Sequence, residues 1–255
     1  GWAALPGARG LLRRVGDEVD VVTYLGEYFR VRLARALSAE AAKRMVRLAP
    51  GVDVTFFRPG AGGQAVRDRL GLGRRPVEAC VSRLVPRKGQ DTLIRAWPGV
   101  RAQVGDALLL LVGDGPYAPA LKRLAQRLGV SDHVLFTGPV PRSDLPGYYD
   151  AADVFAMPCR TRRAGLDVEG LGIVYLEASA IGLPVIGGDS GGAPDAILDG
   201  ESGYVVSDVP TLTARITELL RDPAKAKAMG EKGLAWVDRD WREELPATRL
   251  AALLS

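Results

Sequence analysis

The sequence has 255 residues and is 47% hydrophobic, which is enough for one large domain or for one and a half smaller ones. Its 34 basic and 30 acidic residues leave a net charge of only +4, which does not indicate a nucleic-acid partner but suits an anionic substrate or a membrane surface. Two cysteines, Cys80 and Cys159, are too few for a disulfide framework and favour a reducing cytoplasm. The longest uncharged apolar run near the middle, residues 107–113, is too short to span a bilayer, so no transmembrane segment is predicted.

The first part of the chain predicts one closing βα unit of an earlier domain, with a strand over residues 18–26 and a helix over 27–37. Residues 46–57 show a short apolar run, a Pro-Gly break and a second short strand. The glycine-rich segment 58–63 then predicts a hinge, which divides the chain into domains 1–58 and 59–255. No signal peptide is visible after the initial Gly-Trp, and we expect the chain to be a fragment of a longer protein.

After the hinge, short apolar strands alternate with helices, which predicts an α/β fold with a parallel sheet wound on both sides. Strands are predicted at 77–83, 108–112, 133–137, 154–157, 184–187 and, after a turn, up to 206. Helices are predicted at 89–104, 119–128, 142–151, 172–181, 211–220, 224–237 and 241–254. The last helix has an apolar face that would pack back toward the first domain.

The loops at the carboxyl ends of these strands should hold the ligand, as they do in open parallel sheets. Arg83 and Lys88 follow the first strand of the second domain, and two cations fixed there suit a diphosphate. Gly138 and Val140 close the third strand and offer backbone groups where a base could lie. The alternatives, a solvated basic turn and an ordinary strand exit, remain open.

Two carboxylates bracket a glycine-rich loop and the helix that it opens. Gly170 and Gly172 allow close approach of a ligand, and the unpaired amides at the helix start form an anion-binding site. Glu169 lies in the loop, whereas Glu177 lies among apolar residues, where it stays charged only if hydroxyls or amides donate to it, as a sugar or ribose diol would. The alternative is a pair of carboxylates that only caps a core helix.

The sequence lacks the motifs that are typical of several other kinds of functional site. No GxGxxG follows a strand, so a nicotinamide enzyme is not supported. The one histidine, His133, starts a strand at the opposite edge and is interpreted as structural. Neither a nucleophile nor a metal cluster is apparent, so we predict no metal and no cofactor. A second glycine-rich loop, residues 187–195, is expected to precede a further helix.

Several motifs in this order resemble the donor-binding half of the retaining glycosyltransferases of family four. The resemblance covers residues 46–255 and rests on Arg83 with Lys88, Gly-Asp-Gly-Pro at 113–116, Glu169 with Glu177, and Gly-Gly-Ala-Pro-Asp at 191–195. Asp195 stands where that family more usually has glutamate. The segments 157–162 and 165–177 are similar to the GDP-mannose-dependent mannosyltransferases that build phosphatidylinositol mannosides. Trp2 with Leu5-Pro6-Gly7 is similar to the end of their first domain.

The resemblance implies the GT-B architecture, in which two Rossmann-like domains face each other, with most of the first domain absent here. It assigns the donor diphosphate to Arg83 and Lys88, the transferred sugar to Glu169, and the ribose to Glu177. The remaining donor contacts would come from Gly138 and Val140 and from the amides of Gly170, Leu171, Gly172 and Ile173. Arg83, Lys88 and Glu169 would be the catalytic residues. The leaving phosphate would help to deprotonate the acceptor on the same face, without a metal or a protein nucleophile.

The expected activity is transfer of mannose from GDP-mannose to a phosphatidylinositol mannoside-type lipid. The enzyme would be cytoplasmic or peripheral on the inner face of the plasma membrane. Arg160, Arg162 and Arg163 are predicted to face that anionic lipid or surface, with a solvated basic loop as the alternative. Three other functions remain open: a transferase for another sugar nucleotide and acceptor, an epimerase or phosphorylase on the same architecture, and a donor-binding module without turnover. As a fragment, the chain is expected to bind donor without transferring sugar.

Overall fold

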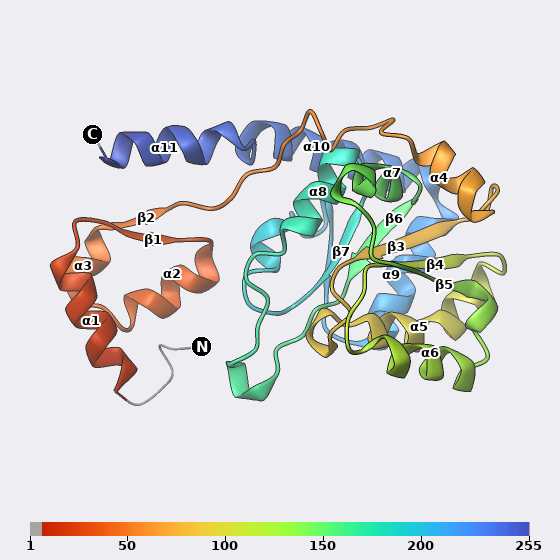
Figure 1. Cartoon of the computed structure of the whole chain (residues 1–255), viewed down its shortest axis with the longest axis horizontal. Coiled ribbons are helices and arrows are strands. Elements are labelled where there is room, and N and C mark those ends of the chain that lie inside the picture. The colour runs from red at the N-terminus through yellow and green to blue at the C-terminus, as the bar shows by residue number, and fades with distance from the viewer. Residues whose placement is uncertain (1–6, 255) are drawn as a thin grey trace.

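The structure, a computed structural model, describes residues 7–254, so the predicted Trp2 motif lies outside the described residues except for Gly7. A smaller unit at the left of Figure 1 contains two parallel strands and the helices beside them. These are α1 (Ala8–Glu18), β1 (Val22–Tyr24), α2 (Glu27–Ala34), α3 (Ala39–Lys43) and β2 (Met45–Arg47). The predicted strand over 18–26 is shorter than expected because α1 continues to Glu18, where Arg14 forms an i,i+4 ion pair at 3.1 Å.

The larger unit is built on a six-stranded sheet in the order β5-β4-β3-β6-β7-β8, with every neighbouring pair parallel. The strands are β3 (Val77–Val81), β4 (Leu108–Val112), β5 (Val134–Gly138), β6 (Val154–Met157), β7 (Val185–Gly188) and β8 (Gly203–Val206). All residues of β3, β4 and β6 are buried, which requires helices on both faces. The predicted doubly wound α/β fold is confirmed.

Helices cover the two faces of this sheet (Figure 1). One face carries α5 (Gln90–Gln103), α6 (Ala118–Arg127) and α9 (Val209–Arg221), and the other carries α4 (Gly63–Leu70), α7 (Leu145–Asp150), α8 (Ile173–Ile181) and α10 (Pro223–Asp240). No helix among residues 7–254 has the length and apolar character needed to cross a membrane.

Two segments connect the units. Residues 48–62 lead from β2 into α4, and α11 (Glu244–Leu254) runs back beside them toward the smaller unit (Figure 1). The Val52 N–H donates to the carbonyl of Trp241 at 2.7 Å, and the carbonyl of Val52 accepts from the Glu243 N–H at 3.1 Å. Trp241, predicted to begin the last helix, instead caps the end of α10, and α11 begins three residues later.

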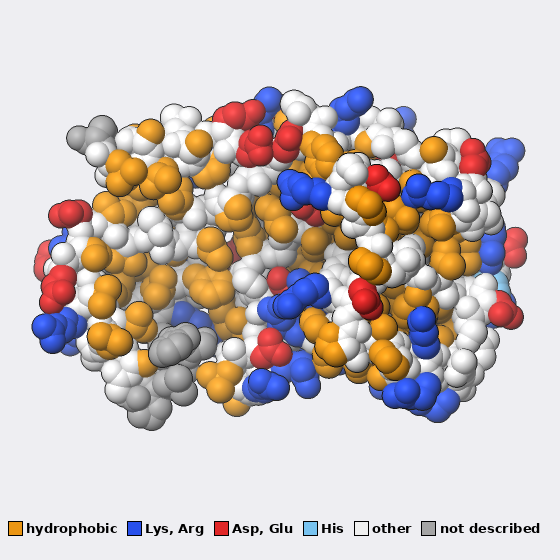
Figure 2. Space-filling view, viewed as in Figure 1, with side chains coloured by type: hydrophobic (Ala, Val, Ile, Leu, Met, Phe, Trp, Pro, Cys, Tyr) orange, Lys and Arg blue, Asp and Glu red, His pale blue; other side chains and the backbone are white. Residues whose placement is uncertain are grey.

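Apolar side chains remain exposed on the smaller unit and on α11, and Figure 2 shows many of them at the left of the molecule. On α1, Leu11 and Val15 are 62% and 48% exposed, and on α11 Leu250 and Leu254 are 43% and 80% exposed. No residue of α11 is buried. The apolar face predicted for the last helix is therefore uncovered in the part of the chain that the structure describes.

Two other sequence predictions are wrong for local reasons. Residues 52–57 form no second strand, because Asp53 Oδ1 accepts from the backbone N–H groups of Thr55 and Phe56 at 2.9 Å and closes a turn. Phe57 is then buried against Tyr149, with ring centroids 5.8 Å apart, so the core of the larger unit begins before the glycine-rich segment. After residues 187–195 there is only one 3-10 turn, Pro194–Ala196, because Ile197 is already extended.

Glu78 lies in the middle of β3 with its side chain completely buried and neither oxygen in a well-formed hydrogen bond. Burial raises the pKa of this carboxyl well above its ordinary value of 4.5, and the Ala156 backbone N–H offsets only part of the rise. The folded state therefore holds a proton that the unfolded state loses as the pH rises. This difference makes the folded state progressively less stable above pH 4.5.

We expect Glu78→Met to raise the free energy of unfolding by about 1–3 kcal/mol at neutral pH. The gain should grow as the pH rises from the ordinary carboxyl pKa, because only the parent must keep a proton on residue 78. Urea unfolding of both proteins across the pH range measures this, with the same substitution at the exposed Glu201 as control. If the difference in the free energy of unfolding between the parent and Glu78→Met does not change with pH, the protonation of Glu78 is not its cause.

Candidate functional site

The candidate site lies where the strand order reverses. β3 and β6 are neighbours in the sheet, pairing Glu78 with Val154, yet the chain leaves β3 toward β4 on one side and leaves β6 toward β7 on the other. At such a point the loops after the two central strands diverge and leave a crevice beyond their carboxyl ends. Arg83 and Lys88 follow β3, and Glu169 follows β6.

The structure joins two of the predicted catalytic residues in a buried ion pair. Lys88 Nζ lies 2.8 Å from Glu169 Oε2, with the side chains 13% and 8% exposed. Lys88 ends the 3-10 turn Pro86–Lys88, and Glu169 lies in the loop before α8. The charge of Lys88 is thus balanced by Glu169. Arg83 has an exposed side chain without an ion-pair partner in the part of the chain that the structure describes.

Gln90 and Arg87 hold the two loops in place, and the sequence did not point to either residue. Gln90 is fully buried and donates through Nε2 to Ser82 Oγ at 2.8 Å and to the Arg83 carbonyl at 2.9 Å. Arg87 donates to the Val168 carbonyl at 2.6 Å, next to Glu169. The one sequence feature that could have indicated a role for Gln90 is its position immediately after the basic turn. That position did not reveal that Gln90 donates to Ser82 and Arg83.

The second glycine-rich loop, residues 187–195, packs against the loop that carries Glu169. The Gly192 N–H donates to the carbonyl of Glu169 at 3.0 Å, and Ser190 Oγ accepts from the Glu169 N–H at 3.4 Å. A Cβ on Gly191 would lie 2.0 Å from the Glu169 oxygen, and one on Gly192 would lie 2.1 Å from the Gly170 oxygen. The two loops approach too closely for any side chain, which explains both glycines.

Three amides of the predicted cradle have no hydrogen-bond partner in the part of the chain that the structure describes. These are the N–H groups of Gly170, Leu171 and Gly172. Gly172 is left-handed, with φ 74°, and α8 begins at the next residue, Ile173. These three amides belong to the loop that leads into the positive end of the α8 dipole, on the residues that directly follow Glu169 of the Lys88–Glu169 pair.

Glu177 and Arg83 line one cavity of about 440 Å³. Glu177 Oε2 accepts from the hydroxyl of Tyr149 at 2.7 Å, a partner on α7 that the sequence did not indicate. Burial raises the pKa of Glu177, while the Tyr149 hydrogen bond and the charge of Arg142 offset part of the rise. Apolar side chains complete the wall of the cavity, among them Val81, Val112, Pro139, Val140, Leu145 and Val174.

The carbonyl of Gly138, a residue predicted to contact the donor, already accepts two hydrogen bonds. They come from the Gly113 N–H at 3.0 Å and from Thr137 Oγ1 at 2.8 Å. Gly138 ends β5 with φ 72°, a conformation that favours glycine, and directs the chain into the segment that places Val140 in the cavity. Gly138 therefore positions the wall of the cavity.

The basic loop before Glu169 is only partly free. Arg160, predicted to face an acceptor or a membrane, instead binds Asp91 through Nη1 and Nη2 at 3.1 and 2.9 Å, which fixes it to the start of α5. Arg162 Nη1 lies 3.8 Å from Asp167. Arg163 is exposed, and with φ 50° it begins a turn of three residues with positive φ.

Asp195 connects the larger unit to the smaller one. Its Oδ2 accepts from the Tyr28 N–H at 3.3 Å, at the start of α2. The N-cap of that helix, Gly26, has no side chain to do this, and a Cβ there would lie 2.3 Å from Asp195 Oδ2. The acidic residue thus caps a helix of the other unit.

Comparison with known proteins gives a consistent family. The family described as glycosyl transferases group 1 matches residues 65–236. A GDP-mannose-dependent alpha-(1-6)-phosphatidylinositol monomannoside mannosyltransferase of Mycolicibacterium smegmatis is 54% identical over the whole chain, which covers 67% of that protein. The corresponding Mycobacterium tuberculosis protein is 51% identical, and the chain covers 66% of it. The chain therefore spans about two thirds of the length of these relatives.

Solved structures of other proteins share this fold. Sucrose-phosphate synthase from Thermosynechococcus elongatus superimposes with a TM-score of 0.81 at 27% identity, over 97% of this chain and 60% of that one. Anabaena Alr3699/HepE, determined with UDP and glucose, gives 0.83 at 24% identity, over 97% and 65%. The latter likeness concerns the fold alone. The family match and the identities over the whole of this chain together show that the chain belongs to the group 1 glycosyltransferases.

Proposed function

We propose that this chain carries the donor site of a retaining glycosyltransferase that transfers mannose from GDP-mannose to a phosphatidylinositol mannoside-type lipid. The observation that carries this proposal is the Lys88–Glu169 ion pair, which lies beside three unpaired amides at the switch point of the sheet. The choice of mannose, guanine and lipid is supported by the names of the relatives that are 48–54% identical. Residues 59–255 would form the donor domain, and residues 1–58 would belong to the acceptor side.

In this proposal the donor would occupy the site in three sections. The nucleoside would occupy the cavity of about 440 Å³, with the base along its apolar wall and the ribose hydroxyls donating to Glu177. The diphosphate would lie across Arg83, Lys88 and the open amides, where cations and N–H donors converge. The sugar would then meet Glu169, whose carboxylate accepts hydrogen bonds from hydroxyl groups.

The same groups account for the chemistry. As the bond between the anomeric carbon and the phosphate oxygen breaks, negative charge grows on the diphosphate. Arg83, Lys88 and the amides of the cradle stabilise that charge. The acceptor hydroxyl attacks from the face that the phosphate leaves, and its proton passes to the departing phosphate oxygen. Because the cations and amides neutralise the leaving group, the proposed reaction requires neither a metal nor a protein nucleophile.

We propose a peripheral position for the enzyme on the cytoplasmic face of the plasma membrane, where its lipid acceptor would lie. The exposed Arg163 and the half-exposed Arg162 are the charges of the basic loop that remain available for an anionic surface. Arg160 contributes to the loop's structure through Asp91.

Incubation with labelled GDP-mannose, with and without phosphatidylinositol monomannoside, tests the proposed activity. Formation of an α-linked mannolipid only when the acceptor is present supports it. A change in the donor sugar without acceptor would instead identify an epimerase. GDP-mannose binding without any product is expected of this chain as a fragment, and the same result in a version extended upstream through the first domain would identify a donor-binding module. Preference for another nucleotide sugar in calorimetry would overturn the assignment of the donor.

The ribose contact of Glu177 is tested separately. GDP should bind about tenfold more tightly than 2′-deoxy-GDP, because the missing hydroxyl removes a hydrogen bond to a charged group. Glu177→Ala should remove most of this preference. The preference should also decline as the pH falls through the raised pKa of Glu177, at a higher pH than for an exposed glutamate. Calorimetry with Glu201→Ala as the exposed control measures it, and equal affinities in the parent would exclude the contact.

A further inference from the structure

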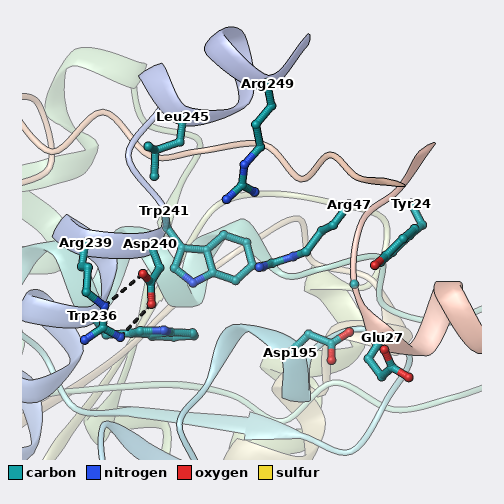
Figure 3. Close-up of a pocket in the computed structure, with 11 residues that line it drawn as sticks. Tyr24, Glu27, Arg47, Asp195, Trp236, Arg239, Asp240, Trp241, Leu245 and Arg249 are labelled. Atoms are coloured by element: carbon teal, nitrogen blue, oxygen red, sulfur yellow. Dashed lines mark hydrogen bonds and ion pairs between the residues drawn. The ribbon is translucent and has the colours of Figure 1, made fainter. Parts of the chain in front are cut away.

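A pocket of about 460 Å³ separates the smaller unit from the junction of α10 and α11, beside Trp241 (Figure 3). Asp195 belongs to its wall, and Figure 3 shows this side chain reaching toward the start of α2, next to Glu27. Among the side chains of the larger unit that the structure describes, Asp195 is the one that forms a hydrogen bond with the smaller unit. Asp195 therefore ties the two units together outside the segments that connect them.

The contact between Asp195 and α2 is close. Asp195 Oδ2 accepts from the Tyr28 N–H at 3.3 Å. Burial raises the pKa of Asp195, whereas hydrogen bonds from the Tyr28 and Glu27 N–H groups and the charge of Arg47 oppose the rise. Gly26 leaves room for the carboxylate, since a Cβ at this N-cap would lie 2.3 Å from Asp195 Oδ2. The smaller unit thus depends on the larger one for the cap of α2.

The segment that contains Asp195 also supports the loop of Glu169. The Asp195 N–H donates to the Gly192 carbonyl at 3.1 Å, at the start of the 3-10 turn Pro194–Ala196. The Gly192 N–H in turn donates to the Glu169 carbonyl at 3.0 Å. The buried Ala193 and Ala196 hold this segment against the core. Two consecutive hydrogen bonds therefore lead from the residue that caps α2 to the backbone of Glu169.

We propose that Asp195 is a positioning residue that couples the loop of Glu169 to the smaller unit through the start of α2. In the function proposed above, on which this inference rests, that loop holds the donor and the smaller unit belongs to the acceptor side. A donor that orders the loop also fixes Asp195 and keeps the smaller unit docked, and docking favours donor binding by the same factor. Asp195 acts through its neighbours, because it lines a different cavity from Arg83 and Glu177.

The experiment measures the distance between two spin labels on the whole chain by pulsed electron paramagnetic resonance. The labels are attached at Glu40→Cys in α3 and Arg127→Cys in α6, both exposed, whereas the native Cys80 and Cys159 are buried. We expect one narrow distance in the parent, which saturating GDP-mannose narrows further. Asp195→Ala should broaden the distances and abolish the response to GDP-mannose. It should also weaken GDP-mannose binding about fivefold in calorimetry.

A cap supplied from within the smaller unit distinguishes coupling from helix capping alone. In the double variant Asp195→Ala with Gly26→Ser, the serine hydroxyl can cap α2 without any contact to the larger unit. The midpoint of thermal unfolding should return toward the parent value, whereas the distances should stay broad and unresponsive to GDP-mannose. A narrow distance in this double variant would overturn the proposal, because Asp195 would then serve only as a helix cap.

Two pairs of matched variants complete the test. Asp189→Ala removes an exposed carboxylate of the same glycine-rich loop and should behave like the parent. Gly26→Ala should displace Asp195 and broaden the distances, whereas Gly10→Ala, whose Cβ meets no atom within 4 Å, should not. If the parent does not bind GDP-mannose, the proposed donor is wrong, and the distances without donor still test the coupling. Equal distances in the parent, Asp189→Ala and Asp195→Ala would overturn it.

Discussion

Replacing Lys88 with methionine is expected to lower the free energy of unfolding by about 3–5 kcal/mol, because it leaves a buried carboxylate without its cation. Lys88 lies 2.8 Å from Glu169, and both side chains are largely buried. The same change should weaken GDP binding at least tenfold, since an ammonium that would bind the diphosphate is lost. Urea unfolding and calorimetry measure the two effects on one protein.

The double variant Lys88→Met with Glu169→Gln separates structure from binding. Removing the carboxylate charge should restore most of the stability, whereas the affinity for GDP should remain low because the cation is still missing. Lys232→Met, at an exposed lysine of α10, should leave both quantities near the parent values. Recovery of GDP affinity in the double variant would show that Lys88 does not bind the diphosphate.

Adding one methyl group at Gly192 should disrupt the donor loop. A Cβ there would lie 2.1 Å from the carbonyl oxygen of Gly170, so one of the two glycine-rich loops must move. We expect Gly192→Ala to cost about 1–3 kcal/mol of stability, the usual effect of overpacking. Affinity for GDP-mannose should fall more than affinity for GDP, because the displaced loop carries Glu169, which would contact the sugar that GDP lacks, whereas the open amides would contact the diphosphate of both ligands.

Gly105→Ala is the matched control for this experiment, since a Cβ at Gly105 meets no atom within 4 Å and neither glycine has positive φ. Differential scanning fluorimetry and calorimetry should show little change in this variant. Equal losses of GDP and GDP-mannose affinity in Gly192→Ala would mean that the loop supports the whole donor site and has no specific role toward the sugar.

The sheet could be predicted from the sequence, and its carboxyl edge could be named as the candidate site, because both depend on local patterns. Wholly apolar strands such as Leu108–Val112 indicate burial on both faces, and their alternation with helices leaves a parallel sheet as the consistent arrangement. In that arrangement the residues after each strand share one edge, so Arg83, Lys88 and Glu169 were expected on the same side of the domain. Local turn chemistry caused the errors: Asp53 closes a turn where a strand was expected.

Contacts between residues far apart in the sequence determined how the side chains of the candidate site are paired. Lys88 meets Glu169 only because β3 lies next to β6, and no local pattern states that order. Tyr149 reaches Glu177 because α7 packs on α8. These partners decide which charges are free, and so Arg83 is available whereas Lys88 is already paired.

The sequence alone determined the α/β class, the edge of the sheet that carries the candidate site and the residue types there, since each depends on neighbours along the chain. Only the tertiary structure decided how those residues are paired, why Gly191 and Gly192 are required, and how Asp195 caps α2. It also created the pocket beside Trp241, whose walls come from both units. The physical reason is that hydrogen bonds and ion pairs act over a few ångströms in space, whatever the separation of their partners in the sequence.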